Sequence, residues 1–219
     1  MNGTDMELRL LEDVMAGGGT LDLPDDGINR IIYVVHGEMS IGSAVLRDDE
    51  SLHVSGASRL AAAPSGATIW RFELAPAAAP LVAFSRPSGS TSEKLVQRLK
   101  WPVADQILIR NDSVSFPPGG CAFLHTHQGP GIRCLIEGGI RIDTMGHSTS
   151  YGPGGAWFES GADPVFAQAA VDRRTRFIRV MVLPARLKGQ SSIAYVNAED
   201  REKPKSQSYK GYVDQPIGS

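Results

Sequence analysis

The stretch CAFLHTHQGPGIRC at residues 121–134 holds two of the chain's five histidines, His125 and His127, one residue apart. Side chains alternate between the faces of a β-strand, so residues two apart share a face with Cα atoms about 6.5–7 Å apart. Two imidazoles placed in this way can bind one metal ion through nitrogens at about 2.0–2.1 Å. The pattern predicts a metal site at the rim of an apolar β-structure, although a single inward histidine more often forms a hydrogen bond in the core. The same alternation predicts that Cys121 and Phe123 share the histidine face.

The elements that must position these histidines are predicted to be short strands. The chain has 24 glycines and 14 prolines, and they separate runs rich in Ile, Val, Leu and aromatic residues. Many short strands with turn signals at regular spacing are typical of an all-β sandwich or barrel. Helical periodicity is confined to residues 5–15, which could equally form a strand, and to residues 92–101.

A weak internal repeat divides the chain. Residues 30–42 (RIIYVVHGEMSIG) are similar to residues 131–143 (GIRCLIEGGIRID), with a turn at Gly37 in one and Gly138 in the other. Such a repeat indicates one supersecondary design used twice. The predicted parts are residues 1–90, a linker at 91–104, a metal-binding domain at 105–190 and an extended C-terminal arm at 191–219, lying on the body or on a neighbouring subunit.

Composition excludes several classes of partner. The chain has 219 residues, of which 42% are hydrophobic, and 22 basic and 24 acidic residues give a net charge of −2. No basic stripe predicts nucleic-acid binding, and no apolar run approaches the roughly 20 residues of a membrane span. Two cysteines are too few for a disulfide scaffold, and the first residues lack a signal-peptide pattern. We therefore expect a cytoplasmic protein with reduced thiols.

The histidine stretch resembles the first cupin motif. That motif has a glycine, five residues, the H-x-H pair, three or four residues, a glutamate, six residues and a glycine. The corresponding positions here are Gly119, His125, His127, Gly131 or Ile132 in place of the glutamate, and Gly138 or Gly139.

The second cupin motif, P-x-G followed after two residues by a histidine, is similar to PGGAWFESG. Pro153 and Gly155 match, and Phe158 stands at the histidine position. The resemblance covers about residues 30–215. It implies an all-β double-stranded β-helix (the cupin jelly roll) in two tandem copies, of which the N-terminal copy is degenerate and the C-terminal copy has an incomplete metal motif.

Two candidates are proposed to complete the metal site. Glu159 lies one residue past the lost histidine, on a strand that faces the histidine strand in the resembled fold, and a one-residue bulge would turn it inward. The alternative is a solvated carboxylate at the rim. Gln128 is the second candidate, although amides are weak ligands. The implied cofactor is a divalent ion: Fe, Mn, Ni, Zn or Co. The other histidines, His36, His53 and His147, compete poorly.

Other residues are candidates for binding or catalysis. Because Arg133 shares strand parity with the lost glutamate, its guanidinium is expected to face the barrel interior and to pair with Glu159 or a substrate carboxylate. Arg179 is a similar case, and an exposed sheet edge is the alternative for both. Tyr151 and Trp157 are predicted at the mouth, where tyrosine can donate a proton, or as plain packing residues.

The resemblance leaves three classes of function open. The first is a metal-dependent enzyme of the dioxygenase, isomerase or lyase type, acting on a small oxygenated or carboxylate-bearing compound. The second is a non-catalytic sensor that binds a small ligand and whose metal site has decayed. A storage role fits poorly with so short a chain. The expected partners are a small, anionic ligand and a second copy of the chain in a homodimer.

Overall fold

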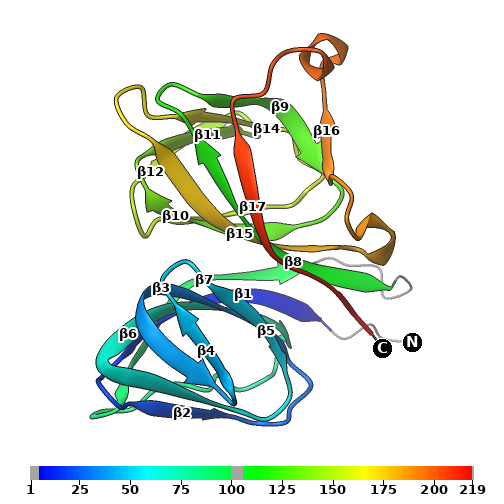
Figure 1. The fold of residues 1–219 in the computed structure, drawn as a ribbon. Coiled ribbons are helices and arrows are strands. Elements are labelled where there is room, and N and C mark those ends of the chain that lie inside the picture. Colours follow the sequence, from blue (N-terminus) through cyan, green and yellow to red (C-terminus); the bar gives the residue numbers. More distant parts are fainter. Residues whose placement is uncertain (1–4, 100–105, 219) are drawn as a thin grey trace. The chain divides into compact units, whose positions relative to one another are not determined.

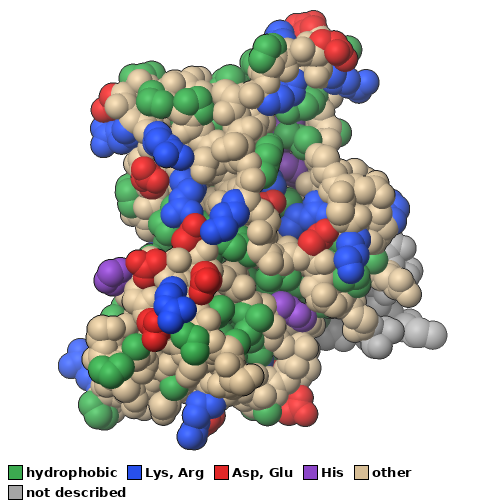
Figure 2. Space-filling view, viewed as in Figure 1, with side chains coloured by type: hydrophobic (Ala, Val, Ile, Leu, Met, Phe, Trp, Pro, Cys, Tyr) green, Lys and Arg blue, Asp and Glu red, His purple; other side chains and the backbone are tan. Residues whose placement is uncertain are grey.

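The structure is a computed structural model and describes residues 5–99 and 106–218. Nearly all regular structure in these residues is β, so the predicted fold class is confirmed. The chain forms two compact units, residues 1–104 (the N-terminal unit) and 105–219 (the C-terminal unit). In the described part of the chain, no helix is long and apolar enough to cross a membrane. Figure 2 shows basic and acidic side chains interspersed on the visible face of both units.

The N-terminal unit is one antiparallel sheet that folds over on itself. Its main path has the order β4-β3-β6-β1-β7, while β2 pairs with β6 and β5 pairs with β3. Both β3 and β6 are long enough to pair with different strands at their two ends. The strands are β1 (Met6–Met15), β2 (Thr20–Leu23), β3 (Asn29–Ile41), β4 (Ala44–Arg47), β5 (Ser51–Ser55), β6 (Ser58–Pro76) and β7 (Gly89–Leu99).

The C-terminal unit consists of two five-stranded sheets (Figure 1), with orders β13-β10-β15-β8-β17 and β12-β11-β14-β9-β16. The strands of the first sheet are β8 (Ile107–Phe116), β10 (Gly131–Glu137), β13 (Ala156–Glu159), β15 (Thr175–Pro184) and β17 (Ser208–Ile217). Those of the second are β9 (Cys121–His127), β11 (Ile140–Thr144), β12 (His147–Tyr151), β14 (Val165–Ala169) and β16 (Ile193–Tyr195). Two 3₁₀ turns, η1 (Ala185–Leu187) and η2 (Ala198–Arg201), flank β16.

The two units repeat one pairing scheme. The path β5-β3-β6-β1-β7 corresponds to β13-β10-β15-β8-β17, and the long strands β3 and β6 correspond to the pairs β10–β11 and β14–β15. The turn glycines also match, because Gly37 has φ 95° and Gly138 has φ 86°. Residues other than glycine rarely adopt this left-handed backbone conformation. The scheme is that of a double-stranded β-helix, so the predicted jelly-roll fold is confirmed.

Two segments with helical periodicity are strands. Residues 6–15 form β1, which pairs with β6 and β7. Residues 89–99 form β7, so the predicted linker at 91–104 begins inside a strand, and its last residues lie outside the described part of the chain. Pairing of β1 with both β6 and β7 supplies ladders of backbone hydrogen bonds, which override the weak helical periodicity of both segments.

The predicted C-terminal arm folds onto its own unit. Residues 193–195 form β16, which extends the sheet beside β9, and residues 208–217 form β17, which pairs with β8 over its whole length. The segment between these two strands lies along the histidine strand β9, where the Val196 amide donates to the Leu124 carbonyl and Ser206 exchanges hydrogen bonds with the Cys121 backbone.

Candidate metal centre

The histidine strand β9 contains a β-bulge that decides which side chains face the barrel. Val165 and Ala167 of β14 lie opposite His125 and Ala122, so three steps of β9 match two steps of its neighbour. A bulge of this kind shifts side-chain parity by one residue. Ala122 packs in the core of the C-terminal unit, and Phe123 lies outside against Lys203. The prediction that Cys121 and Phe123 share the histidine face was therefore wrong.

Both imidazoles are buried and held through their Nδ1 atoms. His125 Nδ1 lies 2.7 Å from the Phe123 carbonyl oxygen, which can only accept, so Nδ1 carries the proton. His127 Nδ1 lies 3.2 Å from the Ser192 hydroxyl, whose own proton points to Met181 Sδ. In both rings Nε2 is left as the lone-pair nitrogen. Metal-binding histidines are oriented by the same kind of contact.

Glu159 faces the same interior space from β13. The strand pairs with β10 without a register shift, with Glu159 opposite Gly131, and strand alternation alone turns Glu159 and Trp157 inward. The predicted inward position is thus correct, but the proposed one-residue bulge is not needed. Trp157 Nε1 donates to Glu159 Oε1 at 2.9 Å. The carboxylate is buried rather than solvated at a rim.

These three residues form a compact ligand set. One ligand atom from each of His125, His127 and Glu159 lies within 4.8 Å of the others, and His127 Nε2 is 3.8 Å from Glu159 Oε2. Ligand atoms bound to one ion at tetrahedral distances lie about 3–4 Å apart. Burial lowers the pKa of His125 and lowers the pKa of His127 well below its ordinary value. Both rings are therefore neutral at pH 7, as metal ligands must be.

The donor chemistry fits a divalent ion. Two neutral imidazoles and one carboxylate, arranged around open positions, form the set that binds Fe(II) in many oxygenases and that also suits Mn(II) and Zn(II). His125 and His127 would supply the nitrogens and Glu159 the carboxylate oxygen. In the described residues this is the one group of three such side chains.

Arg133 fills the space beside Gly131, one of the two positions at which the motif's glutamate is lost. Its Nη1 donates to the Gly131 carbonyl at 2.7 Å, and a Cβ added at Gly131 would lie 3.0 Å from Nη1. Its Nη2 is 2.8 Å from Glu159 Oε2, so the two side chains form a buried ion pair. Burial lowers the pKa of Arg133 to about 10, which still leaves the group charged at pH 7.

Arg179 is the second buried guanidinium of the site. It lies opposite Arg133 on β15 and binds both carboxylate oxygens of Asp112 on β8, at 2.8 and 2.7 Å. Burial alone would lower the pKa of Arg179, but the Asp112 carboxylate raises it above its usual value. Both arginines are inward, as the strand parity of Arg133 predicted. The two cations and the anions Glu159 and Asp112 balance to zero.

The structure separates two predicted residues from this cluster. Gln128 follows His127 directly, so its side chain lies on the opposite face, where it is exposed and accepts from Arg186 at 3.4 Å. Tyr151 stacks on Trp157 with ring centroids 5.0 Å apart and lines neither cavity beside the site. Neither residue is positioned for the role predicted for it.

Two residues of the site had no signal in the sequence. Ser192 lies in a polar segment after η1, and Asp112 is in the middle of β8. Alternation on β8 could have placed Asp112 inward. That it binds Arg179 could not be predicted, because this contact depends on how β8 pairs with β15. The remaining histidines lie elsewhere: His147 is exposed in a hairpin, His36 is near Asp48 at the surface, and His53 is half-buried in the N-terminal unit.

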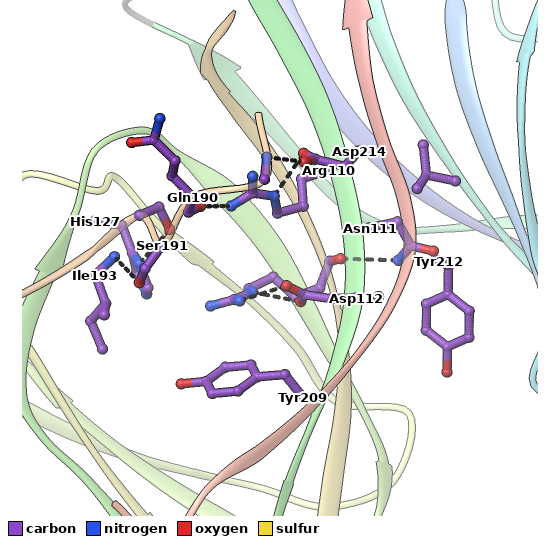
Figure 3. Close-up of a pocket in the computed structure, with 15 residues that line it drawn as sticks. Arg110, Asn111, Asp112, His127, Gln190, Ser191, Ile193, Tyr209, Tyr212 and Asp214 are labelled. Carbon is purple, nitrogen blue, oxygen red and sulfur yellow. Dashed lines mark hydrogen bonds and ion pairs between the residues drawn. The ribbon is translucent and has the colours of Figure 1, made fainter. Parts of the chain in front are cut away.

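Two cavities meet at the candidate metal centre. The inner cavity, of about 20 Å³, is bounded by the ligand set, Arg133 and the apolar core. The outer cavity, of about 490 Å³, lies between the segment 189–193 and β17. Figure 3 shows His127, Ile193, Asp112 and Tyr209 on one side of β8 and β17, around the outer cavity. His127 and Arg179 line both cavities.

Comparison with known proteins rests on structure. No family model matches the sequence, and no curated protein does. An oxalate decarboxylase of Bacillus subtilis, a variant with residues 162–163 deleted, superposes with a TM-score of 0.66 and 11% identity, over 90% of this chain and 73% of that one. Another study of this enzyme concerns its Mn(II) centres. A cupin 2 conserved barrel domain protein from Leptotrichia buccalis gives a TM-score of 0.50 and 14% identity, over 83% of this chain and 86% of that one. At these identities the likeness shows the fold, and this chain has the fold of the cupins.

Proposed function

We propose that this chain is a metal-dependent enzyme that acts on a small carboxylate-bearing compound, with chemistry of the dioxygenase, isomerase or lyase type. His125, His127 and Glu159 would hold a divalent ion. The observation that carries the proposal is the pair of neutral imidazoles, each with Nδ1 fixed, grouped with a buried carboxylate within 4.8 Å. The similarity to a decarboxylase that contains Mn(II) centres supports it.

Charge balance indicates what kind of substrate the site would bind. Arg133 and Arg179 are matched by Glu159 and Asp112, and the imidazoles are neutral. A divalent ion would leave two positive charges without counterions in a buried site, where uncompensated charge is costly. An anionic ligand would supply the missing charge. We therefore propose a carboxylate as the group that binds next to the ion.

The residues of the chain have separate tasks in this proposal. A bound divalent ion would polarise a coordinated carboxylate or carbonyl, or activate dioxygen if the ion is iron. Arg133 would hold the Glu159 carboxylate beside the ion through their buried ion pair. Trp157 would keep the Glu159 carboxylate in one orientation. The apolar core around the inner cavity would exclude bulk water.

One observation favours a second function. Arg133 already neutralises Glu159 without any ion, so the site is electrically balanced in its metal-free form. A protein that binds a small ligand without catalysis, as a sensor does, would need no ion to balance these buried charges. The two functions differ in whether the purified protein contains metal.

Elemental analysis distinguishes them. The protein is purified without an affinity tag, offered Fe, Mn, Ni, Zn and Co, and compared with His125→Ala/His127→Ala, Glu159→Gln and the exposed control His147→Ala. We expect near-stoichiometric metal in the wild type and the control, loss in the double variant and reduced content in Glu159→Gln. A metal-free wild type would contradict the enzyme and leave the sensor.

A further inference from the structure

The inner cavity is too small for a substrate. Its volume of about 20 Å³ holds about one water molecule or one metal ion. The outer cavity of about 490 Å³ is in the size range of sites that bind drug-sized molecules. Because His127 and Arg179 line both, a ligand in the outer cavity lies beside a proposed metal ligand. The body of a substrate must therefore occupy the outer cavity.

The charged groups on the walls of the outer cavity are already paired. Arg110 donates to Asp214 at 2.9 Å and to the carbonyls of Gln190 and Leu187, both at 2.7 Å (Figure 3). The other Asp214 oxygen accepts from the Gly189 backbone amide. These walls therefore offer a ligand little further ion pairing or charge-assisted hydrogen bonding.

The walls also contain the Arg179–Asp112 ion pair and apolar surface. Arg179 uses Nε and Nη2 for Asp112, and no hydrogen bond from residues 5–99 or 106–218 engages its Nη1. The Tyr209 ring, 54% exposed, lies with its centroid 5.9 Å from the Arg179 guanidinium carbon. Ile193 lies across the cavity from it, on the side of His127 (Figure 3). One anionic group and an apolar body would match this surface.

We infer that the substrate is a carboxylate with an aromatic or other bulky apolar body, whose carboxylate faces Nη1 of Arg179, the nitrogen that Asp112 does not bind, and whose body packs between Tyr209 and Ile193 in the outer cavity. The inference rests on the proposed function for what lies beside the carboxylate, but the cavity itself does not depend on a metal. A two-carbon diacid such as oxalate would leave most of the cavity unfilled. The substrate of the structurally similar decarboxylase is therefore not the one expected here.

A glycine of β17 allows a direct test. Gly211 lies opposite Asp112, so a side chain at 211 would point to the same face and into the cavity. A Cβ at this position meets no atom within 4 Å. Gly211→Phe would fill the cavity without disturbing the ligand set. Gly152→Phe is the matched control, because Gly152 is exposed, equally unobstructed and outside the cavity.

The measurement is the affinity for 2-naphthoate, oxalate and acetate by isothermal titration calorimetry, with metal content determined on each sample. We expect 2-naphthoate to bind at least tenfold more tightly than oxalate or acetate. Gly211→Phe should weaken the affinity for 2-naphthoate at least tenfold and leave acetate affinity and metal content unchanged. Gly152→Phe should leave 2-naphthoate affinity, acetate affinity and metal content unchanged. Tyr209→Ala, which removes an exposed ring, should weaken 2-naphthoate in the same way if Gly211→Phe does not fold.

Oxalate binding as tight as 2-naphthoate, or 2-naphthoate affinity unchanged in both Gly211→Phe and Tyr209→Ala, would overturn the inference while metal content still supports the metal centre. A metal-free wild type that binds 2-naphthoate and loses it in Gly211→Phe would support the cavity and refute the metal enzyme. A metal-free wild type that binds none of the probes would refute both.

Discussion

At the scale of single residues, the orientation of the His127 ring depends on the hydrogen bond between its Nδ1 and the Ser192 hydroxyl. We expect Ser192→Ala to weaken metal binding about 10–100-fold, the usual effect of losing a residue that orients a metal ligand. Competition with a chelating dye measures this affinity. Ser191→Ala is the control, because that neighbouring hydroxyl accepts only from the Ile193 amide. Equal metal affinity in the two variants would show that Ser192 does not orient His127.

Arg133 is predicted to stabilise the protein chiefly when no ion is bound. Arg133→Met leaves the Glu159 carboxylate buried with only the Trp157 donor, and breaking a buried ion pair in this way costs about 3–5 kcal/mol. Urea unfolding in chelator should show this loss in the free energy of unfolding. Added Mn(II) should recover much of it, because the ion replaces the missing cation.

A double variant completes the test of Arg133. Arg133→Met/Glu159→Gln removes both charges, so it should be more stable in chelator than Arg133→Met alone. If the single and double variants unfold at the same urea concentration, the ion pair does not account for the cost.

At the scale of the elements, sequence patterns identified the strands better than the directions of their side chains. The turn glycines Gly37 and Gly138 indicated the repeat, because both positions have a left-handed backbone that residues other than glycine rarely adopt. The bulge in β9 could not be predicted, because it arises from pairing with β14, which is 40 residues away in the sequence. Alternation was enough for Arg133 and Glu159, whose strands pair without a shift where they face each other.

The repeat also relates the interiors of the two units. Arg71 of β6 corresponds to Arg179 of β15, because Arg71 lies opposite Ile32 and Arg179 lies opposite Arg133. Arg71 binds both carboxylate oxygens of Asp13 on β1, as Arg179 binds those of Asp112 on β8. In the N-terminal unit this arginine also contacts Glu73, and the buried charges are paired with one another. The same scaffold position thus serves packing in one unit and the candidate site in the other.

The half-buried His53 of β5 gives the N-terminal unit a pH dependence. Burial lowers its pKa, so the unfolded chain takes up a proton below about pH 6.5 before the folded chain does. The unfolded state then binds more protons, and the free energy of unfolding falls as pH falls below 6.5. His53→Gln, whose amide can still donate to Asn29, should lose less stability between pH 7 and pH 5 than the wild type.

Denaturant unfolding in chelator at several pH values measures this slope. Because His125 and His127 are present in both proteins, the difference between the two slopes isolates His53. His147→Gln, at an exposed position, is the control. A His53→Gln slope identical to that of the wild type would contradict the expectation.

At the scale of the whole molecule, we expect one ion per chain. One group of three potential ligands occurs in residues 5–99 and 106–218, and it lies in the C-terminal unit. A saturating ion at 100 times its dissociation constant would stabilise the folded state by about 2.7 kcal/mol. Elemental analysis against protein concentration measures the ratio, and two ions per chain would contradict it. The homodimer and the cytoplasmic location remain predictions.

The shared wall between the two cavities has a consequence for rates. His127 borders both the inner cavity and the outer one, so an ion that leaves through the outer cavity must pass whatever occupies it. A bound aromatic carboxylate would then block this exit and slow the dissociation of the ion, even where the equilibrium affinity for the ion is unchanged. Loss of metal to excess chelator should slow when 2-naphthoate is present, and the loaded protein would keep its cofactor longest while it is engaged with its ligand.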